Sequence, residues 1–351
     1  MKLLVLGGTR FVGRTVVAEA LDRGWEVTAL HRGVTRGLPA GAKELLADRT
    51  DRAALREALG TGEWDVVVDT WAAAPQVATA SAELLRGRAG CYGYVSTSGV
   101  YVWGEHVDED SPLVEGDPHA GQVDYAADKR GAEIGVLASF PHALLARAGL
   151  VLGPYEDSAR WHDGAEGPAA PPVLGRLPWW LRRIAEGGRV VAPGRRERPL
   201  QYVDARDLAG WLLDGLAAGL RGPVDVISRS GHATMEQLLA ACAEVTGSGA
   251  ELVWVSEPDL ATAGAEPWTQ LPCWVPESGE FTGFLESDTS RAAQTGLRCR
   301  PVGETVADTW AWLQQTGAPD RPLDRSVHGL PAELEQRLLA AAVDQGAVRR
   351  G

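Results

Sequence analysis

Residues 2–13 read KLLVLGGTRFVG, and this stretch decides the fold. The apolar run 2–6 is long enough for one buried strand, and the glycine-rich turn 7–13 follows it directly. Residues 15–23 then carry apolar side chains on one side of a helix, a glycine ends that helix, and 26–30 form a second apolar run. Strand, glycine turn, helix and strand in this order predict a βαβ unit of the dinucleotide-binding kind.

The turn can hold a pyrophosphate only if no side chain intrudes on the backbone N–H groups at the helix N-terminus. The first and third positions of the glycine fingerprint are glycines, whereas Arg10 occupies the middle one. The simpler alternative is an ordinary strand–turn–helix connection of a parallel sheet. We predict that the residues of the turn that contact a cofactor are Gly7, Thr9, Arg10, Phe11, Val12 and Gly13.

The end of the second strand indicates which nucleotide binds. An NAD site usually places Asp or Glu there to hold the ribose 2′-hydroxyl. Here the residues are Leu30, His31 and Arg32, without a carboxylate, and a guanidinium suits a 2′-phosphate. Arg10 would add a second positive charge. Unless these arginines merely face solvent, the sequence favours NADP(H) over NAD(H).

Two later strand ends add cofactor candidates. Asp48 and Arg49 follow the predicted strand 43–47, where a carboxylate can accept from an adenine amino group or simply cap the next helix. The predicted strand 64–69 runs into a loop whose small residues would let the backbone lie against the cofactor. The candidates in that loop are Trp71, Ala72 and Ala73.

Further strands at 91–95 and 143–152 alternate with helical segments. This spacing predicts an α/β fold, a Rossmann-type doubly wound parallel sheet with a smaller interleaved α+β substrate domain. The predicted divisions are 1–152 plus about 200–228 for the NADP-binding domain, 153–199 and 229–315 for the substrate domain, and 316–351 for a C-terminal helical tail.

A tyrosine and a lysine stand four residues apart in a helical segment, so Tyr125 and Lys129 share one helix face. A phenol has an ordinary pKa near ~10, and an adjacent ammonium lowers that pKa toward the working range. The same ammonium can bind the nicotinamide ribose. Only three of the 34 basic residues are lysines, as expected from the coding bias of a GC-rich bacterial genome, so a lysine at an indifferent position is unexpected.

The strand 91–95 runs into three hydroxyl side chains at 96–98. A hydroxyl there can hold a substrate oxygen in line while Tyr125 gives or takes a proton and the cofactor carries the hydride. The alternative is an exposed Tyr and Lys on the flank of a helix.

Composition narrows the classes of function. The chain has 351 residues, 45% hydrophobic and 23% charged, with a formal net charge of -13. The negative charge argues against nucleic acid and anionic membrane surfaces as partners. No apolar run has the length of a signal peptide core or a membrane span. The four cysteines are far apart, which argues against a zinc or other metal site and fits a reducing cytoplasm.

Four motifs in order carry a family resemblance: GGTRFVG at 7–13, VSTSGVY at 95–101, Tyr125-x-x-x-Lys129, and YVDARDLA at 202–209. Over roughly residues 1–310 the sequence resembles an extended short-chain dehydrogenase/reductase, of the NAD-dependent epimerase/dehydratase family. The resemblance implies Tyr125 as acid/base and Lys129 as its partner. It implies Thr97 as the hydroxyl residue, with Ser98 as the second choice, and a homodimer as a common assembly.

Departures from the family pattern bear on the reaction. Family dehydratases carry Asp-Glu after the catalytic Thr, and decarboxylating members carry Glu two residues after it. Those positions here are Ser98 and Gly99, so sugar dehydration is not expected. An arginine that often grips a nucleotide-sugar diphosphate is replaced by Leu200, and the nearest substitutes are Arg198 and Arg196.

The segment 266–276 is too rich in proline for a helix and too aromatic for a solvated loop. Trp268 lies in this segment. Together with Trp103 and Trp161 it either lines a pocket for an apolar or ring-shaped substrate or covers the core of the small domain.

We therefore predict an NADP(H)-dependent oxidoreductase that acts on a ketone or secondary alcohol of a small molecule. The first alternative is a nucleotide-sugar epimerase with transient oxidation. The alternative from another class is a non-catalytic cofactor-binding regulator or an RNA-binding protein.

Overall fold

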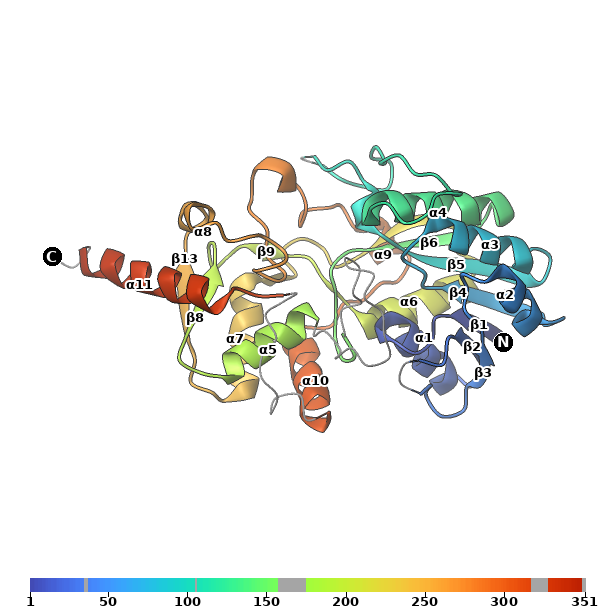
Figure 1. Ribbon diagram of the computed structural model, residues 1–351, viewed down its shortest axis with the longest axis horizontal. Helices are drawn as coiled ribbons and strands as arrows, with labels where there is room; N and C mark the ends of the chain where they lie inside the picture. Colours follow the sequence, from blue (N-terminus) through green and yellow to red (C-terminus); the bar gives the residue numbers. More distant parts are fainter. Residues whose placement is uncertain (35–36, 105, 157–174, 317–327, 349–351) are drawn as a thin grey trace.

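The computed structural model describes residues 1–34, 37–104, 106–156, 175–316 and 328–348. It has two lobes side by side, with the N-terminus in the larger lobe and the C-terminal helix at the far end of the smaller one (Figure 1). No helix in these ranges is long and apolar enough to cross a membrane.

The larger lobe is built on a seven-stranded sheet in which all neighbouring strands are parallel. Its order is β11-β6-β5-β4-β1-β2-β3, so the chain winds outward from β1 in both directions. The strands are β1 (Lys2–Leu6), β2 (Glu26–His31), β3 (Lys43–Leu46), β4 (Trp64–Asp69), β5 (Ala89–Thr97), β6 (Leu144–Ala148) and β11 (Gly222–Val226). The predicted Rossmann-type doubly wound sheet is confirmed.

Helices cover both faces of this sheet (Figure 1). One face packs against α1 (Phe11–Asp22) and α6 (Ala205–Ala217), which also contact each other. The other face packs against α2 (Arg52–Leu59), α3 (Pro75–Leu85) and α4 (Tyr125–Ser139). Because both faces are covered, the strands are almost continuously apolar, as in the run 3–6 of β1.

The smaller lobe has its own hydrophobic core, formed by helices around the parallel pair β8 (Arg189–Pro193) and β13 (Glu251–Val255). The helices are α5 (Arg176–Ala185), α7 (Met235–Thr246), α8 (Glu257–Ala263), α10 (Val302–Gln315) and α11 (Ala332–Val348). Short pairs complete the structure: β7 (Val151–Leu152) with β10 (Val203–Asp204), and β9 (Pro199–Leu200) with β12 (Ala233–Thr234). The remaining short helices are η1 (Ser98–Val100), η2 (Gly279–Phe281) and α9 (Ser290–Gln294).

One predicted element is divided differently in the structure. The predicted strand 143–152 is two strands, because the chain turns between β6 and β7 at Gly149, where a Cβ would lie 1.9 Å from Ile227. Within the motif at 202–209, α6 begins at Ala205, and the Asp204 carboxylate accepts from the backbone N–H of Arg206 as its N-cap.

Part of the predicted tail 316–351 packs on the smaller lobe. Leu334 and Leu338 of α11 join its hydrophobic core, and Glu335 accepts from the Arg183 guanidinium of α5 at 2.9 Å. The three-part division of the chain stays a prediction, and these contacts tie the start of α11 to α5.

A buried ion pair fixes the end of β4. Both oxygens of the Asp69 carboxylate accept from the Arg49 guanidinium, at 2.7 and 2.6 Å, and Tyr92 donates its hydroxyl to the same carboxylate. Asp69 has no exposed surface and Arg49 is 6% exposed. Loss of one partner would leave the other charge buried without compensation.

We expect Asp69→Asn to lower the free energy of unfolding by about 3–5 kcal/mol, because it leaves the guanidinium of Arg49 buried without its counter-charge. Urea unfolding followed by circular dichroism measures this change. The matched control is Glu26→Gln, which breaks the exposed pair with Lys43 and should leave the unfolding midpoint within error of wild type. Equal effects of the two substitutions would contradict the role given to the buried pair.

Candidate active site

The glycine turn leaves its backbone open to a ligand. Gly7 has a φ of +105°, which other residues rarely adopt, and a Cβ at Gly13 would lie 1.8 Å from the carbonyl oxygen of Gly7. The helix α1 begins at Phe11, so its first N–H groups point into this turn. The closeness of Gly7 and Gly13 fits a pyrophosphate at the helix N-terminus.

The other residues predicted in the turn differ in exposure. Thr9 is buried at 7% exposure, Arg10 is exposed, and Phe11 and Val12 are half-buried in the first turn of α1. Phe11 has a φ of +25°, so the chain is bent tightly where it enters the helix. These positions stay predictions for cofactor contacts.

At the end of β2, His31 is buried and Arg32 is exposed. His31 accepts the backbone N–H of Gly33, and its Nε2 lies 2.9 Å from a carboxylate oxygen of Glu44 on β3. Asp48 accepts from the backbone and hydroxyl of Thr50. Burial would raise the pKa of Asp48, yet those hydrogen bonds and the charge of Arg32 hold it below its ordinary value.

Arg49 was predicted as a cofactor contact after the third strand. Its guanidinium is bound to Asp69 and to the hydroxyl of Ser81 inside the lobe. The correction is that this side chain is structural, because its N–H donors are directed to a buried carboxylate and a buried hydroxyl. The loop of Trp71, Ala72 and Ala73 is half-buried, and the backbone N–H of Trp71 also donates to Asp69 at 2.8 Å.

Tyr125 and Thr97 come together in the structure. Thr97 is the last residue of β5 and Tyr125 is the first of α4, and a hydrogen bond joins their side-chain hydroxyls. Thr97 also accepts the N–H of Gly99 at 3.1 Å. Its neighbour Ser96 donates instead to the buried Glu133 at 2.7 Å, and Ser98 is buried at the start of η1. Of the three hydroxyls, Thr97 is the one that contacts Tyr125, and the catalytic roles of Thr97 and Ser98 stay predictions.

Lys129 lies one turn further along α4 and is buried at 3% exposure. Its ammonium donates to the carbonyl oxygens of Trp71 and Val95, at 2.7 Å each, and lies 4.8 Å from the centre of the Tyr94 ring. Burial lowers the pKa of Lys129 to about 7, although the carboxylates of Asp69 and Glu133 act in the opposite direction. The group is thus poised between its two protonation states near neutral pH.

The pKa of Tyr125 differs from expectation. The sequence predicted that Lys129 lowers it. Although 43% of the residue is exposed, loss of water around the phenol raises its pKa above the ordinary value, and the lowering influences are the hydrogen bond with Thr97 and the charge of Arg176. The physical reason is that the ammonium of Lys129 is directed to two backbone carbonyls. Arg176 begins α5 in the smaller lobe and was missed, because no sequence motif marks it.

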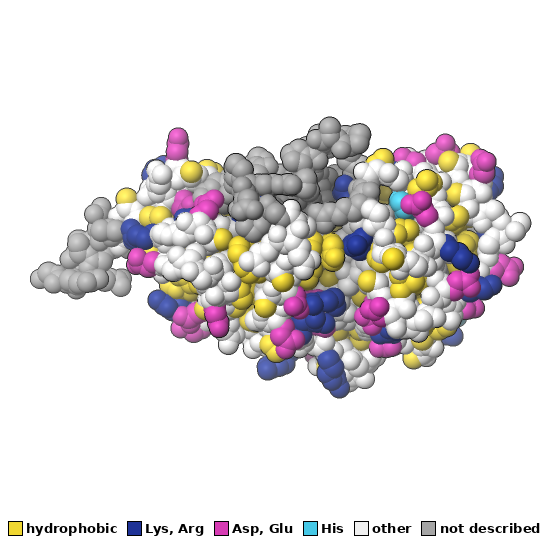
Figure 2. Space-filling view, turned by 90° about the horizontal axis from the view of Figure 1, so that it is seen from below, with side chains coloured by type: hydrophobic (Ala, Val, Ile, Leu, Met, Phe, Trp, Pro, Cys, Tyr) yellow, Lys and Arg dark blue, Asp and Glu magenta, His cyan; other side chains and the backbone are white. Residues whose placement is uncertain are grey.

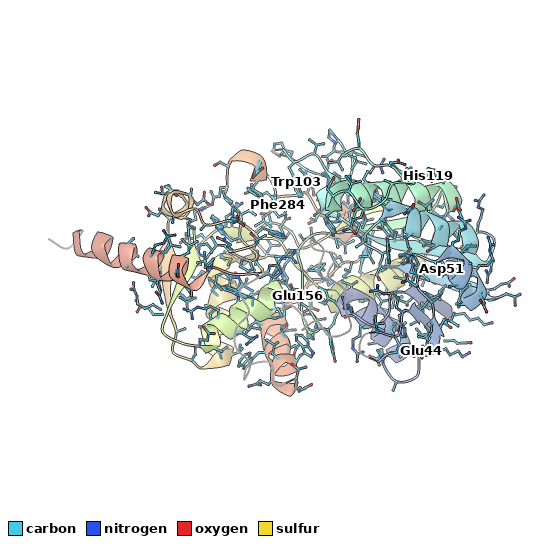
Figure 3. The ribbon with its side chains drawn as sticks, viewed as in Figure 1. Glu44, Asp51, Trp103, His119, Glu156 and Phe284 are labelled. Carbon is cyan, nitrogen blue, oxygen red and sulfur yellow. The ribbon has the colours of Figure 1, made fainter. Side chains whose placement is uncertain are left out.

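Two predicted substrate contacts lie in one aromatic cluster. The Trp103 ring, from the larger lobe, lies 4.7 Å from Phe284, and Phe284 lies 5.1 Å from Trp268 in an edge-to-face arrangement. Trp103 and Phe284 meet where the two lobes face each other, and Glu156 also lies between the lobes, apart from this pair (Figure 3). Trp161 lies outside the described residues.

Arg198 is not available to a substrate diphosphate as predicted. It is 2% exposed, and it donates to Glu286 at 3.0 Å and to the carbonyl of Pro276 at 3.4 Å. Arg196 pairs with Glu236 on the surface, and Leu200 is buried in β9. The correction is that the smaller lobe uses Arg198 to hold its own loops together.

Concave regions also occur away from this site. One of about 440 Å³ lies between α1 and α6, and one of about 650 Å³ borders the edge strand β3. Neither contains Thr97, Tyr125 or Lys129, so the chemistry of the side chains, and not the size of a hollow, identifies the candidate site.

We expect Lys129→Met to gain stability relative to wild type as the pH falls. The folded pKa of Lys129 is about 7, below its ordinary ~10.4, so between these pH values the unfolded chain binds more protons and wild-type stability rises with pH. The loss of wild-type stability that results from burying this amine is complete below pH 7 and absent above the ordinary pKa. Unfolding measured across this range should show the difference, variant minus wild type, shrinking as pH rises, and the exposed Lys43→Met should show no such slope.

Comparisons with known proteins concern the family and the fold. Residues 3–86 match the model of the NAD dependent epimerase/dehydratase family. No curated protein matches the sequence.

Solved structures share the fold at low identity. The enzyme WbmH of Bordetella bronchiseptica, in complex with NAD+, has a TM-score of 0.63 at 18% identity, covering 90% of this chain and 99% of that one. The UDP-glucose 4-epimerase of Thermotoga maritima, with UDP-glucose, has a TM-score of 0.61 at 17% identity with coverage of 90% and 99%. That of Thermus thermophilus, with NAD, gives 0.60 at 21% identity, covering 90% and 99%. Residues 3–86 thus agree with the predicted resemblance to the NAD dependent epimerase/dehydratase family, and the solved structures show that the fold is shared over most of the chain.

Proposed function

We propose that the chain is an NADP(H)-dependent oxidoreductase that interconverts a ketone and a secondary alcohol of a small molecule. The observation that carries this proposal is the hydrogen bond between the hydroxyls of Thr97 and Tyr125 at the carboxyl end of the parallel sheet. Ligands of doubly wound sheets bind at that end of the strands. The glycine turn 7–13 follows β1 at the same end of the sheet.

Each side chain has a role in this reaction. A bound nicotinamide would supply or accept the hydride. Tyr125, kept protonated by its raised pKa, would donate a proton to the carbonyl oxygen during reduction. Thr97 would hold the same oxygen in line. Lys129, one helical turn from Tyr125, would hydrogen-bond the nicotinamide ribose.

The preference for NADP(H) is supported by charge. Arg32 is exposed directly after β2, and Arg10 is exposed in the turn. A planar guanidinium binds a phosphate through two parallel hydrogen bonds. The family model and several similar structures name NAD, so the 2′-phosphate is the part of this proposal that rests on the arginines.

A nucleotide-sugar epimerase is the second candidate. It is favoured by the structural similarity to UDP-glucose 4-epimerases. It is disfavoured by the burial of Arg198 and Leu200 at the positions where a diphosphate would need a free cation. Net consumption of NADPH distinguishes the two, because an epimerase returns its hydride to the substrate.

A cofactor-binding regulator or an RNA-binding protein is less well supported. The net charge is -13, and acidic and basic side chains are interspersed on the face shown in Figure 2. Nucleic acid binding needs a basic face to neutralise phosphates.

We expect Tyr125→Phe to lower the rate of NADPH oxidation with ketone substrates by roughly 100- to 10,000-fold while cofactor binding is retained, because general acid catalysis contributes about that factor. The matched control is Tyr202→Phe, which removes a buried hydroxyl that donates to the carbonyl of Arg300 and should keep its turnover. Full turnover in the Tyr125 variant would remove the catalytic assignment.

We expect Arg32→Ala to raise the Michaelis constant for NADPH roughly 10- to 100-fold and to leave that for NADH unchanged, since a hydrogen bond to a charged group contributes about 1.5–3 kcal/mol. Arg52→Ala, which removes an exposed guanidinium paired with Glu83 on α2, serves as the control. Unchanged discrimination between the two cofactors would refute the preference for NADP(H).

A further inference from the structure

The guanidinium of Arg176 makes no hydrogen bond to any other residue in the part of the chain that the structure describes. Its Nε is buried without a partner, while 28% of the side chain is exposed. A buried polar nitrogen without a partner costs free energy and calls for an explanation. The exposed part of the guanidinium has N–H donors without an acceptor among the described residues, and an anionic group in its plane would supply one.

The carboxylate of Glu156 does not satisfy this cation. Glu156 is 2% exposed, and its oxygens accept the backbone N–H groups of Arg176 and Leu177 at 2.7 and 3.2 Å, which caps α5. The guanidinium lies 3.9 Å from the same carboxylate, beyond hydrogen-bond distance. Glu156 therefore attracts Arg176 without using its N–H donors.

An aromatic ring fixes the other face of the guanidinium. The central carbon of Arg176 lies 4.6 Å from the centre of the Trp268 ring, so the cation is stacked and its N–H edge is oriented. Trp268 itself has a φ of +63°, an unfavourable value for a bulky residue, and its backbone N–H donates to the carbonyl of Trp274 at 2.9 Å. Strain of this kind is concentrated at binding sites.

The aromatic cluster continues from Trp268 through Phe284 to Trp103 of the larger lobe. The three rings are half-buried, so they retain surface for a ligand. The charge of Arg176 also lowers the pKa of Tyr125, against the effect of burial. By its stacking on Trp268, Arg176 lies at the end of this apolar wall.

We propose that Arg176 binds an oxyanion of the substrate, a carboxylate or a phosphate, while Trp268, Phe284 and Trp103 pack against an apolar ring of the same molecule. This inference rests on the proposed function, because it places the anion next to the carbonyl that Tyr125 would protonate. The substrate class is then a ring-bearing oxo acid or phosphate ester of a keto compound.

Binding of three small probes tests the proposal without any turnover. Isothermal calorimetry with benzoate, phenyl phosphate and benzyl alcohol should show wild type binding at least one anion about tenfold or more tightly than the neutral alcohol. Whichever anion binds more tightly identifies the oxyanion. Arg176→Met should remove the preference and Arg176→Lys should keep part of it. Trp268→Ala should weaken all three probes alike.

The matched control is Arg196→Met, since Arg196 also stacks on an indole, at 5.4 Å from Trp254, but is paired with Glu236 on the surface. It should bind the probes as wild type does. Equal affinity of wild type for anions and alcohol, an anion preference that survives in Arg176→Met, or no binding of any probe would overturn the proposal. Tyr125→Phe should keep the preference for anionic probes and lose turnover of ketones. An error in the proposed function would therefore change the turnover result, whereas an error in the anion site would change the binding result.

Discussion

The ammonium of Lys129 is held between the carbonyl oxygens of Trp71 and Val95, at 2.7 Å from each. This contact joins α4 to the ends of two neighbouring strands, β4 and β5. The loop of Trp71 is held in turn by Asp69, which is bound to Arg49 inside the lobe. Tyr125 lies one helical turn before Lys129. Its position therefore depends on the buried contacts that link Lys129, the loop of Trp71, Asp69 and Arg49.

A second buried network binds the hydroxyl of Ser96, the neighbour of Thr97. Ser96 donates to Glu133 of α4, and Glu133 also accepts two hydrogen bonds from Arg147 of β6. Glu133 lies two helical turns after Tyr125 on the same helix, so α4 contacts the end of β5 at two successive residues, Ser96 and Thr97. Arg147 is 2% exposed and is therefore a structural residue.

The candidate site is made by both lobes. Thr97, Tyr125 and Lys129 come from the larger lobe, whereas Arg176 and Trp268 come from the smaller one. The chain passes between the lobes several times, and the short pair β7 with β10 holds two of these passages together. A substrate that contacts both lobes would thus be recognised by groups far apart in the sequence.

The sequence alone determined the βαβ unit, the parallel sheet and the spacing of Tyr125 and Lys129, because these follow from local patterns: apolar runs, glycines at a turn and a period of one helical turn. Only the tertiary structure decided the partners of the charged side chains. Arg49 and Arg198 were predicted at ligand sites but lie buried against Asp69 and Glu286, and Arg176 was not predicted at all. The sequence shows that an arginine is present but not whether its guanidinium binds a carboxylate of the protein or a ligand. The long-range folding of the chain decides which of the two partners is near.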